Sequence, residues 1–479
     1  MAKSQMHDTT SAVTCLTSVF LDLLKTEFPA LAQFEDEAVR IGHQAIAEAM
    51  GRALEMLDRE LCSDLPKGTC IHETRRRTLA TEVGDVSFSR RVCRDGYGCA
   101  YVPLDEAIDL PRGMRISPGA FAFLIDAGAE VSYQKAADLL ARAGGSAVTA
   151  RSVMRAMRKT GDACEQADVL LAHELYVNGV LPDAEAEEKE ICLEADGTYI
   201  PLQEGGKVEV KALVAYAGKR KTGNRAERVG PVRFGCVSDP RGFWTQGMAA
   251  VGSRFDLSKI EVCHTGFDGE AQYKAAASYL RTGAAIDGNL DPFHVNRYVA
   301  ACFNGKDAGY RQVMDCLWSG HARDAADLLE ECHGAGEANA NARRVAAYIR
   351  NNAEYIRSGS VSLGTMEAEQ EHLYKSRMAS VPCAWSRKGV NDMARIRSRK
   401  YSKREVVMPT REGSLSEGRR RRRERSIERA LTGTCAHPRR AEGRGWEYPY
   451  RASVDNLRSD IRYHCGMHDD HWVRESDPQ

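Results

Sequence analysis

The sequence contains no uncharged apolar run of about 18 residues, the length that a helix needs to cross a bilayer. Its N-terminal stretch, MAKSQMHDTTSAVTCLTSVFLDLL, also lacks the basic segment, compact apolar core and small-residue cleavage site typical of a secretory signal. Both absences argue against a membrane or secreted protein. They favour a cytoplasmic location.

Paired CxxC spacings are missing too. The 15 cysteines are scattered and odd in number, which fits reduced thiols in a cytosol better than a disulfide scaffold. The last of them lie in a C-terminal tail with loosely zinc-like clustering. Their spacing matches no defined zinc module, so chance proximity is the preferred interpretation. The tail residues concerned are Cys435, His437, His464, Cys465, His468 and His471.

Net charge is the third absence. Lys+Arg and Asp+Glu each total 67, so the overall balance does not indicate a polyanionic partner. The distribution is uneven, because arginines crowd the segment from about Arg387 to Arg444. We expect so many guanidinium groups to face solvent or phosphate, and we favour salt-dependent, largely sequence-independent contact with DNA over a solvated tail.

A chain of 479 residues exceeds one ordinary core and predicts about three domains at roughly 150 residues each. Apolar positions at three-to-four spacing predict helix from about Val13 to Leu61. The stretch from Thr74 to Leu110 alternates instead, with Gly84-Asp85 and Asp95-Gly96 as turn signals, and so predicts a small antiparallel sheet. We assign both to an N-terminal region, residues 1–115.

Residues 116–182 contain a pattern typical of a helix-turn-helix. Ser132 is placed to cap YQKAADLLARAG, Gly144-Gly145 to turn the chain, and Thr149 to cap ARSVMRAMRKTG. The second helix carries cations on or near one face, as contact with a DNA groove requires. A plain helical hairpin with solvated cations is the alternative. The cations are Arg151, Arg155, Arg158 and Lys159.

After an acidic linker, Asp183 to Glu190, the composition becomes strand-rich. ICLEADGTYIPLQ and VEVKALVAYAG predict an antiparallel pair, VRFGCVSD a third strand and KIEVCHTG a fourth. Helical patterns follow in YKAAASYLR, HVNRYVAACF, DAADLLEEC and ANARRVAAYIRNNAEYIR. Strands followed by helices predict an α/β core over residues 191–400, with a helical insertion at about 295–360 and a basic, partly flexible tail at 401–479.

Two carboxylates interrupt apolar strand patterns just before a glycine. Asp196 lies in LEADGTYI, and Asp268 follows the fourth strand in HTGFDGEA. Carboxylates at strand ends of one sheet can share divalent cations, because Mg²⁺ prefers hard oxygen ligands. Taken singly, an Asp-Gly step is more typical of a turn than of a metal ligand, so the pattern alone leaves both interpretations open.

The blocks EADG, DGEAQY, LDPFH and MEAEQEHLYKSRMASVPCAWS follow one another in that order. This ordered set resembles the ISLre family of bacterial insertion-sequence transposases, DDE enzymes related to the Mutator type. The resemblance covers roughly Leu193 to Arg397, and more loosely the sheet and helix-turn-helix before it. It implies an α/β fold with an RNase H-like mixed-sheet catalytic core and a helical insertion, preceded by an α+β region containing the helix-turn-helix.

The resemblance also implies the activity and the partners. The chain would be a DNA transposase that cleaves strands at transposon ends and transfers them into target DNA, using two Mg²⁺ or Mn²⁺ ions. Double-stranded DNA and further copies of the chain would be its partners, and the location would be cytoplasmic and nucleoid-associated. A non-catalytic DNA-binding protein, an inactivated relic, and an RNase H-like nuclease that does not join strands stay open as alternatives.

Carried over by position, the family's first aspartate falls on Asp196, its second on Asp268 and its glutamate on Glu367. Its tryptophan-serine step falls on Trp385-Ser386. The chain departs from the pattern in two places: a phenylalanine precedes Asp268 where glycine is usual, and the glutamate segment holds further acids. A shift in register would make Glu371 the ligand instead, one turn on from Glu367.

Accessory positions come from the same blocks. Glu209 and Lys211 resemble the family's E-x-K pair. Two roles stay open for them: binding phosphate or tuning the metal site, and forming an exposed cross-strand ion pair. Asp291 and His294 resemble the block after the second aspartate. Asp291 rivals Asp268 as a ligand, although a helix N-cap explains it equally well. Further DNA contacts are expected from Arg377, Arg395, Arg397 and Arg399.

Overall fold

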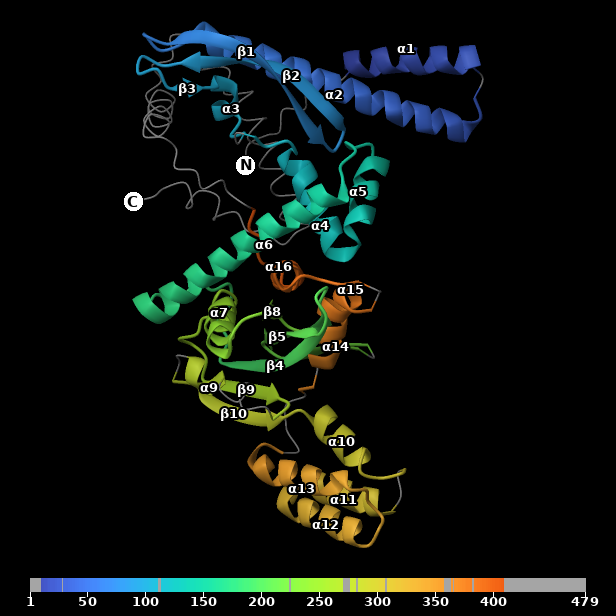
Figure 1. Cartoon of the computed structure of the whole chain (residues 1–479), viewed down its shortest axis with the longest axis vertical. Helices are drawn as coiled ribbons and strands as arrows, with labels where there is room; N and C mark the ends of the chain where they lie inside the picture. The colour runs from blue at the N-terminus through green and yellow to red at the C-terminus, as the bar shows by residue number, and fades with distance from the viewer. Residues whose placement is uncertain are drawn as a thin grey trace. The chain divides into compact units, whose positions relative to one another are not determined.

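In a computed structural model of the chain, the structure describes residues 10–408 apart from 28, 111–112, 224, 270–275, 281–282, 306–307, 357–362, 365 and 381–382. These residues form two compact units, 10–156 and 157–408, whose elements are labelled in Figure 1. The boundary lies within one long helix, α6 (Ala150–His173). Among the described helices, none combines the length and the apolar character that crossing a membrane requires.

The N-terminal unit begins with the helices that the spacing predicted. They are α1 (Thr10–Glu27) and α2 (Leu31–Ser63). Pro29 lies in the break between them, where its missing amide hydrogen removes a helical hydrogen bond. The alternating stretch forms the predicted antiparallel sheet, in the order β1-β2-β3. Its strands are β1 (Cys70–Thr81), β2 (Gly84–Arg94) and β3 (Ala100–Tyr101).

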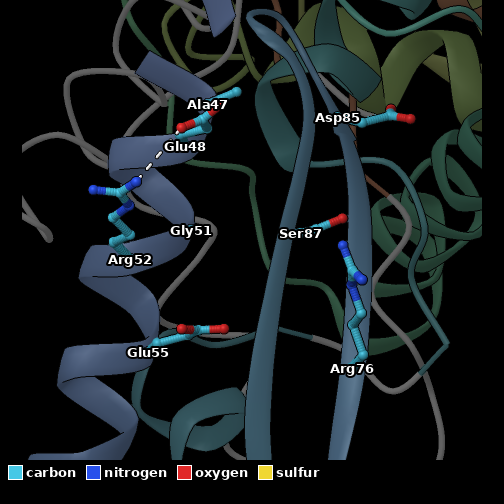
Figure 2. Close-up of a pocket in the computed structure, with 8 residues that line it drawn as sticks. All are labelled: Ala47, Glu48, Gly51, Arg52, Glu55, Arg76, Asp85 and Ser87. Carbon is cyan, nitrogen blue, oxygen red and sulfur yellow. Dashed lines mark ion pairs between the residues drawn. The ribbon is translucent and has the colours of Figure 1, made fainter. Parts of the chain in front are cut away.

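Helix α2 protects the edge of β2 that β1 leaves unpaired. The backbone amide of Ser89 donates to Glu55 at 2.7 Å, and that of Arg91 donates to Asp58 at 3.1 Å. Helix and strand approach closely at Gly51, where a Cβ would lie 2.5 Å from the carbonyl oxygen of Ser87. A cavity of about 290 Å³ lies beside this contact. Figure 2 shows the residues that line it.

The helices of the expected helix-turn-helix are present with their predicted caps. Ser132 accepts from the amide of Lys135 at 3.2 Å, and Thr149 accepts from that of Ser152 at 3.2 Å. The second helix does not end at the predicted glycine: α6 continues to His173, followed by a π-helical turn, η1. The elements here are α3 (Pro103–Ala107), α4 (Pro118–Glu130), α5 (Tyr133–Arg142), α6 and η1 (Glu174–Asn178).

The second unit is mixed α/β around a five-stranded sheet in the order β10-β9-β4-β5-β8. β4 pairs antiparallel with β5, and β5 pairs antiparallel with β8. β4 and β10 both pair parallel with β9. The strands are β4 (Glu190–Pro201), β5 (Lys207–Tyr216), β8 (Val232–Cys236), β9 (Val262–Phe267) and β10 (Ala285–Leu290).

The four predicted strands are confirmed, but three others were missed. β10 reads AIDGNL, and its glycine and polar residues carry little strand signal. β6 (Lys219–Thr222) and β7 (Arg225–Arg228) form a separate antiparallel hairpin. Because KRKT and RAER contain almost no apolar residue, the alternation that identifies a half-buried strand is absent from them.

Helices cover both faces of the sheet. On one face, α7 (Pro240–Gly252) brings Gly247 against Leu213 and Phe234. On the other face, Gly235 approaches Tyr374 and Ser398. Successive strand residues point to opposite faces, which explains why Phe234 and Gly235 contact different layers. The second layer contains α14 (Met366–Gln370), the π-helical turn η3 (Glu371–Lys375), α15 (Ser376–Met378) and α16 (Arg387–Tyr401).

The predicted helical insertion is present between β10 and α14. The pattern missed α11 and extended the last helix too far, because Asn351 and Asn352 are poor helix formers and α13 ends there. Of YKAAASYLR, the described helical part is α9 (Ala276–Tyr279). The insertion contains α10 (Pro292–Ala300), α11 (Ala308–Trp318), α12 (Ala322–Gly334), α13 (Asn341–Asn351) and the 3-10 turn η2 (Ala353–Tyr355).

The prediction that the arginine-rich segment faces solvent holds for Arg387 at its start but is wrong for the other arginines of its described part. Arg395 is 1% exposed, Arg397 2% and Arg399 6%. Arg395 and Arg399 each bind the buried Asp168 of α6 at 2.7 Å. Arg397 donates to the backbone carbonyl groups of Leu373 and His372. These three arginines are therefore core residues and not DNA contacts.

Arg377 is corrected for the same reason. It is buried, and its guanidinium lies 5.0 Å from the centre of the Trp385 ring. The number of arginines in a segment does not predict their burial. Each buried arginine here interacts with an acid, an aromatic ring or a carbonyl group from another segment, and the local sequence does not identify that partner. The run GRRRRRERSIERA and the tail cysteines and histidines lie outside the described residues.

Candidate active site

Two aspartates lie where parallel pairing in the central sheet stops. β4 and β9 pair from Glu190 with Val262 to Glu194 with Gly266, and the same register two residues further places Asp196 beside Asp268. Asp268 directly follows β9, as predicted. Asp196 is not at a strand end, because β4 continues past it and pairs with β5 as far as Pro201.

The three predicted carboxylates line one cavity of about 340 Å³ in the second unit, and His294 joins them. Ligand atoms of Asp196, His294 and Glu367 all lie within 4.8 Å of one another, close enough to hold a metal ion. The remaining lining residues are Gly197, Thr198, Tyr199, Glu209, Arg297, Gln370 and Lys375. Residues from β4, β5, the end of β9, α10 and the α14–η3 segment thus meet at one place.

Asp196 is buried beside a second negative charge. Burial raises the pKa of its carboxyl to about 6, and the charge of Asp268 acts in the same direction. One oxygen of Asp196 accepts from the amide of Gly197 at 2.7 Å. Two acids that disfavour each other's ionisation in this way are stabilised when a cation binds between them.

Asp268 is positioned by the helical insertion. The hydroxyl of Tyr348 on α13 donates to the backbone carbonyl of Asp268 at 2.6 Å. Gly269 adopts a φ of +95°, and a Cβ there would lie 2.9 Å from the Tyr348 ring. The glycine after Asp268 is therefore needed both for the turn and for the approach of the tyrosine.

Glu367 projects from α14 into the cavity, where Lys375 lies 3.3 Å from its carboxylate. Its neighbour Glu369 is buried and bound to Arg228 and Arg233. Glu371, the alternative ligand, begins the π-helical turn, lies 3.4 Å from Ser380 and is not among the residues that line the cavity. The geometry favours Glu367 over the shifted register.

A buried glutamate that the sequence reasoning missed holds the approach to α14. Glu194 accepts from the hydroxyl of Tyr216 at 2.6 Å and from the amide of Gly364 at 2.7 Å. Gln370, at the other end of α14, donates to the carbonyl of Gly197 on β4 at 3.1 Å. The helix that carries Glu367 is thereby fixed to the central strand at both ends.

The rival aspartate is a helix cap. Asp291 accepts from the amide of Phe293 at 2.9 Å and lies 3.3 Å from Nδ1 of His294 with its other oxygen. It is not among the residues that line the cavity. The adjacent Asp291 carboxylate raises the pKa of His294, and burial opposes that rise. Asp291 therefore orients His294, which faces the acids.

The predicted E-x-K pair is an ion pair of 2.5 Å between Lys211 and Glu209. It is not the exposed pair of the alternative reading, since Lys211 is only 8% exposed. Glu209 lines the cavity. On α6 of the expected helix-turn-helix, the predicted cations are all exposed, and three of them follow the spacing of one helical face. They are Arg151, Arg155, Arg158 and Lys159.

Several site residues were absent from the sequence-based prediction. Arg297 lies three residues after His294 on α10, a spacing that could have indicated a shared helical face. Lys375 lies in the same block as Glu367, but the π-helical turn makes its position unreadable from ordinary helical spacing. Glu194 and Tyr348 act through backbone atoms of other segments, which no local pattern records.

Comparison with known proteins gives one family. Residues 24–412 match the model described as "Uncharacterised protein family (UPF0236)". A relative from Streptococcus gallolyticus, "UPF0236 protein in vanSb 3'region", is 24% identical over 385 residues, covering 78% of this chain and 83% of its own. A UPF0236 protein from Caldanaerobacter subterraneus subsp. tengcongensis is 22% identical over 397 residues, covering 80% of each chain.

Proposed function

We propose that this chain, which belongs to the protein family UPF0236, is a DNA transposase that cleaves transposon ends and joins them to target DNA. Asp196, Asp268 and Glu367 would form its catalytic site. The observation that carries the proposal is their convergence in one cavity from β4, the end of β9 and α14. These are the three positions to which the resemblance to ISLre transposases assigns the catalytic acids.

The strand order supports an RNase H-like core. In β10-β9-β4-β5-β8, an antiparallel meander adjoins two parallel strands, and the acids lie on and beside the central pair. The sheet thus offers a cleft at the point where its strand direction changes, the usual place for a ligand in an open α/β sheet. The insertion α10–α13 contributes His294 to the same cleft, and its Tyr348 binds the backbone carbonyl of Asp268.

The donor set fits divalent cations of the magnesium and manganese class. Asp196 and Glu367 supply hard oxygen ligands at one point together with His294, and Asp268 lines the same cavity. The charge repulsion between Asp196 and Asp268 would be relieved by a bound cation. When bound, two such ions activate the attacking hydroxyl and stabilise the leaving oxygen of a phosphodiester. His294 has an imidazole within reach of the same point, which favours Mn²⁺ as the more tolerant probe.

The remaining residues of the cavity have roles that follow from their charge and place. Lys375 lies against Glu367 and neutralises it when no phosphate or metal is near. Arg297 lines the cavity from α10 and is exposed, so it can bind a phosphate oxygen of the DNA strand. Asp291 and Tyr348 keep His294 and Asp268 in place.

The reaction then consists of two phosphoryl transfers. In the first, water attacks the phosphate at the transposon end, the bond to the 3′-oxygen breaks and a 3′-hydroxyl is released. In the second, this hydroxyl attacks a target phosphate and displaces the target's own 3′-oxygen. The exposed face of α6, with Arg151, Arg155 and Arg158, would hold the duplex through its backbone.

The names of relatives give independent support. The name of the Caldanaerobacter relative joins eleven serial designations, and another relative from this organism joins four. Shared names of this kind are expected when one protein is encoded at many places in a genome. Multiplication within a genome is the direct product of transposition, and a regulator or a housekeeping nuclease gives no reason for it.

The proposal is tested with the full chain and a supercoiled plasmid that carries the ends of its own element. We expect nicking in Mn²⁺ or Mg²⁺ and a loss of more than about 100-fold in Asp196→Asn, since even residues that only orient metal ligands cost 10–100-fold. Asp324→Asn, on the exposed surface of α12, is the matched control and should nick normally.

Three outcomes would contradict the proposal. Nicking by Asp196→Asn at the wild-type rate would show that the catalytic site is assigned to the wrong residues. DNA binding without nicking by the wild type would indicate a DNA-binding protein or a relic. Nicking without joining of strands would indicate an RNase H-like nuclease. Anisotropy with labelled end DNA, run beside each assay, shows that the Asp196→Asn variant still binds.

A further inference from the structure

The β6–β7 hairpin is a basic arm in the second unit. Among residues 219–228 there are five basic side chains and one acid, within a chain whose net charge is zero. Arg220 and Glu227 lie 3.8 Å apart at 72% and 66% exposure, and so exposed a pair neutralises little. Lys221 is exposed as well. The basic residues are Lys219, Arg220, Lys221, Arg225 and Arg228.

The base of this arm is fixed to the segment that carries Glu367. Arg228, the last residue of β7, binds the buried Glu369, two residues after Glu367 on α14. Glu369 also binds Arg233 of β8 at 2.7 Å, so its carboxylate bridges the hairpin, the sheet and the helix. An arm anchored in this way keeps a defined position relative to the cavity.

A second connection runs through a tyrosine. Lys219 and Arg228, the two ends of the hairpin, each lie 5.9 Å from the ring centre of Tyr216. The hydroxyl of Tyr216 donates to Glu194, which accepts from the amide of Gly364 just before α14. The hairpin base therefore contacts the middle of the Glu367 segment directly at Glu369 and is linked to its start through Tyr216 and Glu194.

We propose that the β6–β7 hairpin binds the phosphate backbone of duplex DNA beside the cavity, and this inference rests on the proposed function. Four extended residues reach about 13 Å, which corresponds to about four base pairs along the duplex axis. The cations at the base hold the arm, and Arg220 and Lys221 supply contacts to the DNA. Loading of DNA on the arm is thereby linked to the placement of Glu367.

The chemistry of the arm favours DNA over a protein partner. The exposed side chains described on it are charged apart from that of Ala226. A protein interface needs an apolar centre, and this hairpin has none among its described side chains. Binding to the regularly spaced phosphates of DNA requires only exposed cations on an element long enough to span several of them, and the hairpin has both properties.

The test is the salt dependence of DNA binding by Arg220→Gln/Lys221→Gln. Each cation that neutralises a phosphate adds about 0.9 to the slope of log K against log salt, so the double variant should have a slope shallower by about 1.8. Arg343→Gln/Arg344→Gln on α13 is the matched control, because it also removes two adjacent exposed cations. Its slope should equal that of the wild type, and thermal unfolding should be unchanged in both variants.

An unchanged slope in the hairpin variant overturns the inference, and so does an equal decrease in the control. The proposed function can fail separately: wild-type protein that binds DNA with the expected slope but never nicks it contradicts the transposase and leaves the arm intact. If the wild type nicks DNA and the hairpin variant keeps the full salt slope, the hairpin does not bind DNA, while the assignment of the active site is unaffected.

Discussion

Asp168 lies among three buried arginines, and we expect its removal to lower the free energy of unfolding strongly. It lies 2.7 Å from Arg395 and from Arg399, and 3.7 Å from Arg404. Burial alone would raise the pKa of Asp168, but the charges of Arg399 and Arg395 outweigh burial and hold that pKa below its usual value. Asp168→Asn leaves the guanidinium groups without this anion, which costs about 3–5 kcal/mol for a buried pair.

Urea unfolding followed by circular dichroism measures this cost. The control is Asp327→Asn, which breaks an exposed pair with Arg350 and should cost less than about 1 kcal/mol. The pH dependence has a definite sign. Because the folded pKa of Asp168 is depressed, its contribution is present above the unfolded value near 4 and is lost as pH falls through the folded value. A cost for Asp168→Asn as small as that of the control would refute the buried network.

Three further predictions follow from single contacts. Tyr348→Phe removes the hydroxyl that donates to the Asp268 carbonyl, so it should lower the free energy of unfolding by about 1 kcal/mol. It should also weaken Mn²⁺ binding measured by calorimetry, and an unchanged Mn²⁺ affinity would show that Tyr348 does not position the site. Gly269→Ala should destabilise by about 1–2 kcal/mol in urea because of its left-handed φ. Burial raises the pKa of Asp392 to about 6, so its contribution to stability falls as pH rises from 4 to 6. The wild type should therefore lose stability relative to Asp392→Asn over this range, and parallel slopes would contradict the assignment.

The parts of the fold that local chemistry encodes were predictable. Ser132 and Thr149 cap helices because a hydroxyl before an amphipathic pattern satisfies a free amide, and both caps are present. An acid and a glycine that interrupt an apolar strand pattern made Asp196 and Asp268 candidates, and the resemblance to ISLre transposases selected them. Their position in one cavity agrees with that reasoning, although Asp196 lies inside its strand.

The parts that depend on distant partners were not predictable in the same way. The local sequence predicts that Arg395 and Arg399 are surface residues. They are buried because both bind Asp168, which lies more than two hundred residues earlier in the chain. Glu194 and Tyr348 hold backbone atoms of other segments, so their spacing from the acids carries no signal. Local patterns identify which groups can react, whereas the structure identifies what holds them.

The central claim is tested most directly by strand joining from an end that has already been cleaved. A labelled duplex with a free 3′-hydroxyl at the element's end is incubated with plasmid, Mn²⁺ and the full chain, and joined products are separated by size. Wild type and Glu371→Gln should give the same yield, while Glu367→Gln, which alters the carboxylate in the cavity, should give none. Joining at wild-type yield by Glu367→Gln, or no joining by the wild type, would contradict the account.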